Sequence, residues 1–346
     1  MTSIAIIGDL FMLSDVFEEK IREQCEGALD IRSMQMPWPD EPVVHGYADD
    51  GIAGLKEYMG DPDQIVSFIG DAEILVTHLA PMSADMLAQL PSLKMIAVSR
   101  GGPVNIDAKA AGERSVLVVN TPGRNATAVA EFTLGAILAE TRMIRSGHES
   151  MRKGEWRGDL YRADRTGREL NELVVGVIGY GNIGRRVVKL LRAFGTKVVV
   201  SDPYVQLDAE DLNAGVELVG LEQLLESSDV VTLHPRVTDE TQGMMNDKTF
   251  GQMRDGAIFI NTARGPLVDY AALYRALDSG PLAGAMLDTF DIEPLPEDWP
   301  LLELENITLT PHIAGASVRT VTYAAEQSAI EIHRYLKGLS PINPAT

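Results

Sequence analysis

Cysteine is nearly absent from this chain: Cys25 is the only one among 346 residues. A single cysteine excludes an internal disulfide framework and a thiolate zinc cluster. We therefore expect no metal site, a buried apolar role for Cys25, and a reducing, cytoplasmic environment.

Positive charge is also scarce. Thirty Lys and Arg stand against fifty Asp and Glu, which gives a formal net charge of −20 at pH 7. A surface of this sign repels nucleic acids and anionic membranes, so we expect neither as a partner. It repels small anionic ligands as well, so any such ligand must be bound by basic residues at particular places. Isolated arginines are therefore candidate binding residues for an anionic ligand.

Long apolar runs and internal repeats are missing too. No stretch reaches the roughly 18 apolar residues that a membrane helix needs. The first ten residues contain Asp9 where a secretory signal has basic residues. With 45% apolar and 23% charged residues, the composition is that of a globular protein, and the length suggests two domains.

Short β-branched apolar runs alternate with helical patterns along the chain. Such runs are typical of parallel strands that are buried on both faces and joined by helices, so the predicted fold class is α/β. We place the strands at residues 4–8, 73–79, 93–99, 115–120, 173–179, 197–202, 229–234, 257–262 and 307–312.

Three segments stand outside this alternation. Residues 34–64 contain four prolines and four glycines, which predicts a long loop with a short helix. Residues 125–146 have a broad apolar surface and predict one helix at a hinge or an interface. Residues 318–338 predict a last helix that ends at Gly338.

A glycine-rich turn follows the strand predicted at 173–179. It reads Gly179-Tyr180-Gly181-Asn182-Ile183-Gly184 and leads into a segment with helical apolar spacing. In such a turn Gly179 permits the tight bend, Gly181 lets a pyrophosphate approach the backbone, and Gly184 lets the helix pack closely on the sheet. The helix N-terminus then binds the anion.

Asp202 ends the next predicted strand, 21 residues after Gly181. A carboxylate in this place accepts hydrogen bonds from the adenosine ribose and repels a 2′-phosphate, and no arginine follows it. The sequence therefore predicts a dinucleotide site that prefers NAD to NADP.

Three later segments place polar residues after apolar strands, where an open parallel sheet binds its ligands. Arg264 lies in Asn-Thr-Ala-Arg-Gly, Glu293 in Asp-Ile-Glu-Pro, and His312 in Thr-Pro-His. A guanidinium pairs with a carboxylate, and a His that meets a Glu forms an acid/base pair. Each residue also has an ordinary interpretation when it is considered alone. Arg264 could form a surface ion pair, Glu293 could be a solvated carboxylate, and His312 could be a hydrogen-bonded loop residue.

In their order and spacing, these motifs resemble the D-isomer-specific 2-hydroxyacid dehydrogenase family, which is NAD-dependent and similar to phosphoglycerate dehydrogenase. The resemblance covers about residues 93–338. It implies hydride transfer between NAD(H) and C2 of a 2-hydroxy or 2-keto acid. Arg264 would hold the carboxylate and polarise the C2 carbonyl, His312 would supply the proton, and Glu293 would keep His312 protonated.

The resemblance also implies further cofactor contacts and a domain plan. Cofactor contacts would include Asn182, Ile183, His234, Thr262, Ala263 and Asp288, the last through the nicotinamide carboxamide. We expect two Rossmann-like, doubly wound parallel-sheet domains with a cleft between them. Residues 1–121 and 318–346 would form a discontinuous substrate domain, and residues 122–317 the NAD domain. The 125–146 helix is similar to the family's dimerisation helix, which implies a homodimer.

The chain departs from the family pattern near the expected substrate loop. Arg100 precedes Gly101 and Gly102, whose N–H groups would bind the substrate carboxylate. Arg100 suggests a second anionic or polar group on the substrate, and His78 could line the same pocket. The alternatives are a structurally paired Arg100 and a hydrogen-bonded core His78.

Two other functions stay open at this point. One is an NAD(H)-sensing protein that has kept the fold and lost turnover, although all three candidate catalytic residues are present. The other is a formate-type dehydrogenase of the same superfamily, which resembles this chain less because it has an amide in place of Glu293.

Overall fold

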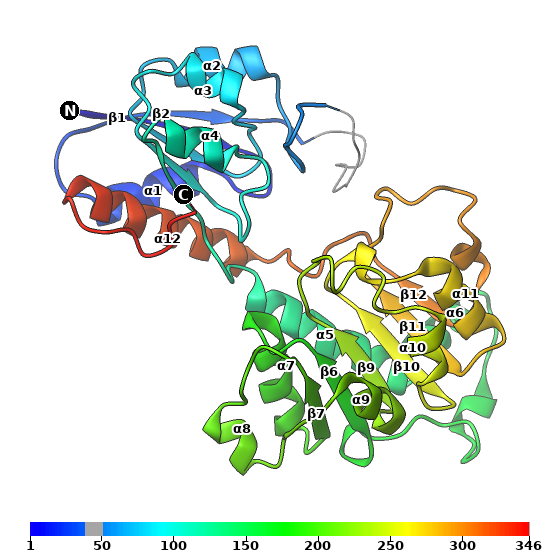
Figure 1. Cartoon of the computed structure of the whole chain (residues 1–346). Helices are drawn as coiled ribbons and strands as arrows, with labels where there is room; N and C mark the ends of the chain where they lie inside the picture. Colours follow the sequence, from blue (N-terminus) through cyan, green and yellow to red (C-terminus); the bar gives the residue numbers. More distant parts are fainter. Residues whose placement is uncertain (39–50, 346) are drawn as a thin grey trace. The chain divides into compact units, whose positions relative to one another are not determined.

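The computed structural model describes residues 1–38 and 51–345, and the chain divides into two compact units. Unit 1 consists of Met1–Asn125 and Ser317–Thr346, and unit 2 consists of Ala126–Ala316. In Figure 1 the N-terminal segments in blue and cyan and the C-terminal helix in red belong to the same unit.

Unit 1 is built on a five-stranded, fully parallel sheet with the strand order β2-β1-β3-β4-β5. The strands are β1 (Thr2–Gly8), β2 (Leu29–Gln35), β3 (Ile74–Thr77), β4 (Met95–Val98) and β5 (Leu117–Val119). The helices are α1 (Ser14–Gln24), α2 (Pro62–Ile69), α3 (Ala84–Ala88), α4 (Ala108–Glu113) and α12 (Val318–Leu336).

Both faces of this sheet are covered by helices (Figure 1). Successive side chains of a strand point to opposite faces. Ile4 and Ile6 of β1 therefore pack in the same core as residues of α1 and α12, whereas Ala5 and Ile7 pack with α2, α3 and α4. This explains why the strand is a continuous apolar run in sequence.

Unit 2 has a seven-stranded parallel sheet with the order β12-β11-β10-β9-β6-β7-β8. Its strands are β6 (Val174–Ile178), β7 (Lys197–Ser201), β8 (Glu217–Leu218), β9 (Val230–Leu233), β10 (Ala257–Asn261), β11 (Leu282–Leu287) and β12 (Ile307–Leu309). Its α-helices are α5 (Ala126–Thr141), α6 (Ile144–Arg152), α7 (Asn182–Ala193), α8 (Ala209–Asn213), α9 (Leu221–Ser227), α10 (Asp247–Gly251) and α11 (Tyr270–Asp278). Short 3₁₀ turns lie at Gly158–Tyr161, Leu170–Glu172, Gly265–Leu267 and Pro300–Glu303.

The strand order of unit 2 is that of a dinucleotide-binding sheet extended by one strand. The order reverses between β6 and β9, and ligands bind in such sheets outside the carboxyl ends of the strands at the reversal. α5 and α7 pack on one face of this sheet, and α9, α10 and α11 pack on the other. The predicted α/β class with two doubly wound parallel sheets is confirmed.

The helix predicted over 125–146 is wrong in its extent. α5 ends at Thr141, and Met143 adopts the left-handed conformation with φ 55° before α6 begins. Of the segment predicted as a loop, residues 34 and 35 end β2, residues 62–64 begin α2, and residues 39–50 lie outside the described part of the chain.

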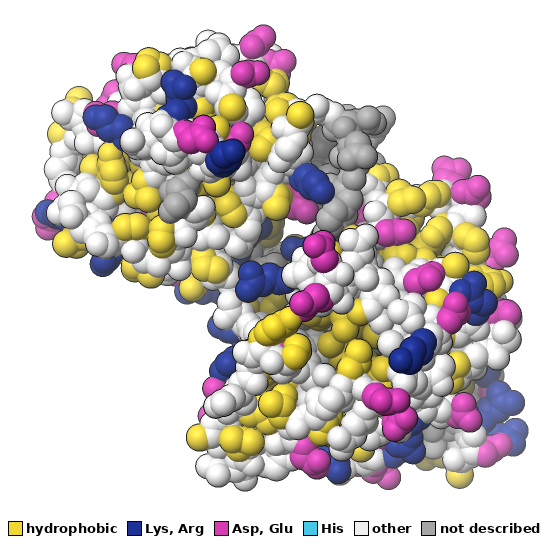
Figure 2. Space-filling view, in the orientation of Figure 1, with side chains coloured by type: hydrophobic (Ala, Val, Ile, Leu, Met, Phe, Trp, Pro, Cys, Tyr) yellow, Lys and Arg dark blue, Asp and Glu magenta, His cyan; other side chains and the backbone are white. Residues whose placement is uncertain are grey.

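The surface of each unit mixes both signs of charge. Figure 2 shows acidic and basic side chains interspersed with apolar ones over the visible face. Among the described residues, no helix is long and apolar enough to span a bilayer.

Candidate active site

The glycine turn of unit 2 connects β6 to α7. Gly179 has a φ of 90°, and a Cβ on Gly184 would lie 2.0 Å from the carbonyl oxygen of Gly179. The helix therefore begins directly against the turn, which requires glycine at both places. A Cβ on Gly181 would meet nothing within 4 Å, so the backbone there faces open space at the start of α7.

Asp202 follows β7 and is fixed by two backbone donors. Its Oδ2 accepts a hydrogen bond of 2.8 Å from the N–H of Tyr180, and its Oδ1 accepts one of 3.0 Å from the N–H of Tyr204. The carboxylate thus stands beside the glycine turn. Open space at the start of α7 and an oriented carboxylate on the next strand are what a bound NAD requires, so these residues fit that cofactor.

His234 follows β9, the strand next to β6. Its N–H donates to the carbonyl of Ile178 at 2.8 Å, and its ring Nε2 lies 3.1 Å from the hydroxyl of Thr232. Burial lowers the pKa of His234 to about 3, so this ring stays neutral at physiological pH.

Thr262, Ala263 and Arg264 follow β10. The hydroxyls of Thr262 and of Thr133 on α5 are 2.8 Å apart, and the N–H of Ala263 donates to the side chain of Asn261. Arg264 is exposed, and its Nη1 donates to the carbonyl of Ala263 at 2.7 Å. Among the ion pairs of the described residues, none involves Arg264.

A close approach places the Arg264 loop against the loop that carries Glu293. A Cβ on Gly265 would lie 1.9 Å from the backbone carbon of Phe290, so only glycine fits between the two loops. The N–H of Phe290 in turn donates to Oε1 of Glu293 at 2.8 Å. The structure thus places the loops after β10 and β11 side by side.

Glu293 and His312 form the acid/base pair that the motifs suggested. His312 Nδ1 lies 2.8 Å from Glu293 Oε2, and the side chains are 25% and 9% exposed. This contact fixes the orientation of the imidazole ring. The fixed Nδ1 leaves Nε2 as the nitrogen that can exchange a proton with a ligand.

Asp288 holds the loop on which His312 lies. Fully buried, it accepts hydrogen bonds from the hydroxyl of Thr310 at 2.6 Å and from the N–H groups of Ile313 at 2.9 Å and Ala314 at 2.8 Å. Desolvation raises the pKa of Asp288, and these donors oppose that rise. His312 itself has a φ of 53°, so the loop conformation is held by tertiary contacts.

In unit 1, Arg100 has a charge partner within the chain. Its guanidinium forms a salt bridge with Glu57 and also donates to the carbonyl of Glu57 at 3.0 Å, and both side chains are largely buried. The following Gly101 and Gly102 are exposed. Within the described residues, their N–H groups make no hydrogen bond and remain able to receive a carboxylate.

His78 is buried and belongs to a cluster that sequence reasoning did not find. Its Nδ1 lies 2.6 Å from Asp9, and its Nε2 lies 3.2 Å from a guanidinium nitrogen of Arg124. Asp9 directly follows the first predicted strand, so the rule that strand ends carry ligand residues would have singled it out. Arg124 lies in an ordinary turn sequence that carries no such signal.

Comparison with known proteins shows the family of this chain. The family model described as D-isomer specific 2-hydroxyacid dehydrogenase, NAD binding domain, matches residues 134–314. A glyoxylate reductase of Thermofilum pendens is 36% identical over 307 residues, which cover 88% of this chain and 91% of the relative. A D-3-phosphoglycerate dehydrogenase of Archaeoglobus fulgidus is 38% identical over 266 residues, covering 77% and 50% respectively.

Solved structures are similar over the whole chain. D-2-hydroxyisocaproate dehydrogenase superposes with a TM-score of 0.83 at 25% identity, covering 100% of both chains. A D-lactate dehydrogenase of Aquifex aeolicus, complexed with NAD and lactic acid, has a TM-score of 0.72 at 26% identity, covering 97% and 96%. The chain therefore belongs to the D-isomer specific 2-hydroxyacid dehydrogenase family and is an NAD-dependent oxidoreductase.

Proposed function

We propose that this enzyme reduces a small 2-keto acid to the D-2-hydroxy acid, with Arg264, Glu293 and His312 as its catalytic residues. The observation that carries this assignment is the 2.8 Å contact between His312 and Glu293. It lies in the unit that contains the glycine turn, and Arg264 comes from the adjoining loop.

Each residue has a defined part in the reduction. Arg264 binds the substrate carboxylate with its planar fork of donors and polarises the C2 carbonyl. NADH held at the turn of Gly179, Gly181 and Gly184 would supply the hydride that C2 receives. As the C2–O oxygen gains charge, His312 donates its Nε2 proton to that oxygen, which completes the hydroxyl group. Glu293 stabilises the protonated ring before the transfer and fixes its orientation.

We assign NAD binding to unit 2 and substrate binding to unit 1. The first assignment is supported by the match of the NAD-binding family model to residues 134–314 and by the turn at Gly179. The second is supported by the exposed N–H groups of Gly101 and Gly102, which suit a carboxylate. Relatives named for glyoxylate and for 3-phosphoglycerate both act on small 2-oxygenated acids, which favours this substrate class.

The test is NADH oxidation with a panel of 2-keto acids. We expect the wild type to reduce at least one of them and Arg264→Gln to lower kcat/KM by at least about tenfold, because a charged hydrogen bond to the substrate is lost. Arg254→Gln, in the loop before β10, is the matched control and should behave as the wild type. Tight NADH binding without turnover of any acid would contradict the proposal.

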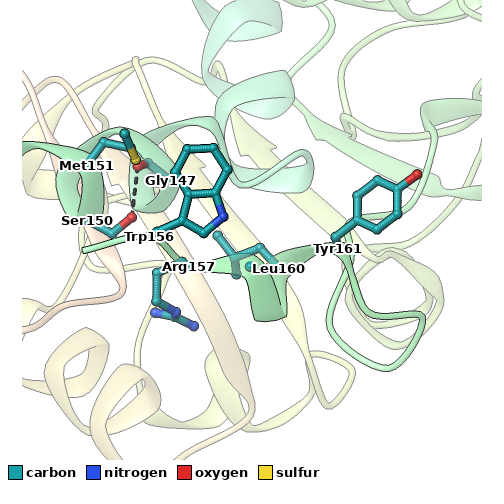
Figure 3. Close-up of a pocket in the computed structure, with 8 residues that line it drawn as sticks. Gly147, Ser150, Met151, Trp156, Arg157, Leu160 and Tyr161 are labelled. Carbon is teal, nitrogen blue, oxygen red and sulfur yellow. Dashed lines mark hydrogen bonds between the residues drawn. The ribbon is translucent and has the colours of Figure 1, made fainter. Parts of the chain in front are cut away.

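We further propose that the enzyme is a homodimer that associates through α6 and the segment after it. This surface exposes Trp156 by 84% and Tyr161 by 95%. Figure 3 shows the Trp156 indole beside the part of α6 that carries Gly147 and Met151, with Tyr161 pointing away from them. Exposed aromatic patches of this kind are typical of protein interfaces.

Sedimentation velocity tests the dimer. Trp156→Glu places a charge in the patch and should convert the dimer to a monomer. Leu212→Glu changes an exposed apolar residue on α8 instead and should leave the dimer intact. A wild type that sediments as a monomer would overturn the proposal.

We also propose a cytoplasmic location. Cys25, the single cysteine, is buried and unpaired, which suits a reducing compartment. Recovery of the protein from the cytosolic fraction of its cells would support this location, and recovery from an extracellular or membrane fraction would contradict it.

A further inference from the structure

Asp9, His78 and Arg124 form a polar cluster in unit 1 that the catalytic scheme does not use. Asp9 follows β1, His78 follows β3, and Arg124 lies in the segment after β5. β1 and β3 are neighbours, and the strand order reverses between them because β2 lies on the other side of β1. Open parallel sheets bind ligands at this point, outside the carboxyl ends of the strands. The cluster therefore lies where the fold offers a binding site.

The hydrogen bonds determine where the proton of His78 lies. Arg124 donates only, so the contact of 3.2 Å between its Nη2 and His78 Nε2 requires Nε2 to accept. The ring proton is then on Nδ1 and is donated to Asp9 at 2.6 Å. Burial and the charge of Arg124 lower the pKa of His78, although Asp9 opposes this. The cluster therefore consists of an ionised Asp9, a neutral His78 and a charged Arg124.

Asp9 is a fixed anchor for this arrangement. It is fully buried, and its Oδ1 accepts hydrogen bonds from the N–H groups of Phe11 and Met12 at 2.9 and 2.8 Å. Burial opposes its ionisation, but His78 and the two backbone donors outweigh burial and hold the pKa of Asp9 below its ordinary value. The edge of the Phe11 ring also contacts His78, with the ring centroids 5.9 Å apart.

Arg124 contacts no carboxylate directly. Arg22, Arg32 and Arg100 each form an ion pair with a carboxylate, whereas Arg124 contacts a neutral imidazole, and the charge of Asp9 acts on it from beyond that ring. Its Nη1 is shielded from solvent and has no hydrogen-bond partner within the described residues. A shielded donor that has no acceptor lowers the stability of the fold. A ligand that accepts a hydrogen bond from Nη1 would therefore explain why an arginine occupies this position.

The charges of the chain indicate that the ligand bound by Arg124 is an anion. In a protein with a net charge of −20, an oxyanion is attracted only where a cation is held in place. Burial lowers the pKa of Arg124 to about 10, so it stays charged at physiological pH. Its guanidinium carbon lies 6.0 Å from the centre of the Phe11 ring, which further restricts its orientation.

We propose that Arg124, positioned by His78 and Asp9, binds an oxyanion group of the substrate, a carboxylate or a phosphate other than the C1 carboxylate. This inference rests on the proposed function, with unit 1 as the substrate domain. It transfers to Arg124 the specificity role that the sequence suggested for Arg100, whose charge is matched by Glu57. Arg124 is thus a binding residue, and His78 and Asp9 are positioning residues.

A binding experiment tests the site without turnover. The full-length enzyme is titrated with succinate and, separately, with inorganic phosphate, and the ring nitrogens of His78 are followed by ¹⁵N NMR. Their signals are identified as those lost in His78→Asn. We expect a saturable shift in the wild type with at least one of the two anions. Arg124→Gln should abolish it, Arg124→Lys should weaken it, and the surface control Arg114→Gln should preserve it. No shift in the wild type, or an equal shift in Arg124→Gln, would overturn the site.

A kinetic experiment tests its role in specificity. Two charged substrates are compared with matched neutral ones: 2-ketoglutarate with 2-ketopentanoate, and phosphohydroxypyruvate with hydroxypyruvate. Arg124→Gln should lower kcat/KM for at least one charged acid by at least about tenfold, chiefly through KM, and change the neutral acids by less than about twofold. The larger decrease shows whether the natural group is a carboxylate or a phosphate.

The results with the neutral acids distinguish an error in the proposed function from an error in the proposed role of Arg124. If the wild type reduces none of the four acids, the proposed function is wrong for these substrates and the NMR result alone decides the anion site. If the wild type reduces the acids and Arg124→Gln changes charged and neutral ones equally, or changes neither, the proposed role of Arg124 is wrong while the function stands.

Discussion

Replacing His312 by Gln removes the proposed proton donor and keeps a side chain of similar length. In the structure the ring is anchored through Nδ1 to Glu293 at 2.8 Å, which leaves Nε2 as the nitrogen that would deliver the proton. A positioned general acid contributes roughly 10²–10⁴ in rate. At 1.36 kcal/mol per factor of ten, the barrier to reduction should therefore rise by about 3–5.5 kcal/mol. We expect kcat for reduction to decrease by the same factor.

Single-turnover kinetics with NADH loss as the signal measure this effect directly, because product release does not enter. NADH affinity, measured by calorimetry, should change by less than about twofold, since loss of a general acid acts on the reaction step. His148→Gln, on the exposed side of α6, is the matched control and should react as the wild type. A His312→Gln enzyme that keeps more than a tenth of the wild-type rate would refute the assignment.

Three further substitutions test the rest of the site. Glu293→Gln removes the carboxylate that lies 2.8 Å from the His312 ring, so kcat for reduction should decrease while NADH affinity changes by less than about twofold; an unchanged kcat would show that Glu293 is not the partner of His312 in turnover. Asp202→Ala should weaken NADH binding and reduce the preference over NADPH, measured as the ratio of the two dissociation constants; an unchanged ratio would place cofactor selection elsewhere. Gly184→Ala puts a Cβ 2.0 Å from a carbonyl oxygen and should lower the free energy of unfolding by about 1–3 kcal/mol in urea titrations and weaken NADH binding; unchanged values would disprove the close packing of turn and helix.

The fold can be predicted from sequence where a buried strand is a run of large apolar residues, as in β6, β7, β9 and β10. The interior strand β11 is missing from the prediction because small residues, Ala-Gly-Ala, occupy its middle, and β8 is missing because it is an exposed edge strand of two residues. β2 was missed because it is an edge strand on which polar and half-buried residues alternate. The break between α5 and α6 was missed because Arg142, Met143 and Ile144 all suit a helix, so only tertiary packing determines the turn at Met143.

The sequence identifies candidate residues of the site, but it does not show which of them are in contact. Glu293 and His312 lie 19 residues apart on separate loops, and their spacing says nothing about whether they meet. The partner of Arg100 is Glu57, from a segment without periodicity, so its charge pairing had no signal in sequence. Asp9 and His78 come from the ends of strands that only the sheet order makes neighbours, and Arg124 comes from the segment after β5 and reaches His78 through a contact that no spacing in the sequence indicates.

The central claim is that hydride passes from NADH to C2 of a 2-keto acid, with the D-isomer as product. It is tested most directly by running the reduction with NADH deuterated at the reactive position of the nicotinamide. The product is then analysed by mass spectrometry and by chromatography on a chiral phase. We expect a D-2-hydroxy acid with one deuterium at C2, and an L-product, a racemate or a product without deuterium at C2 would contradict the proposed hydride transfer.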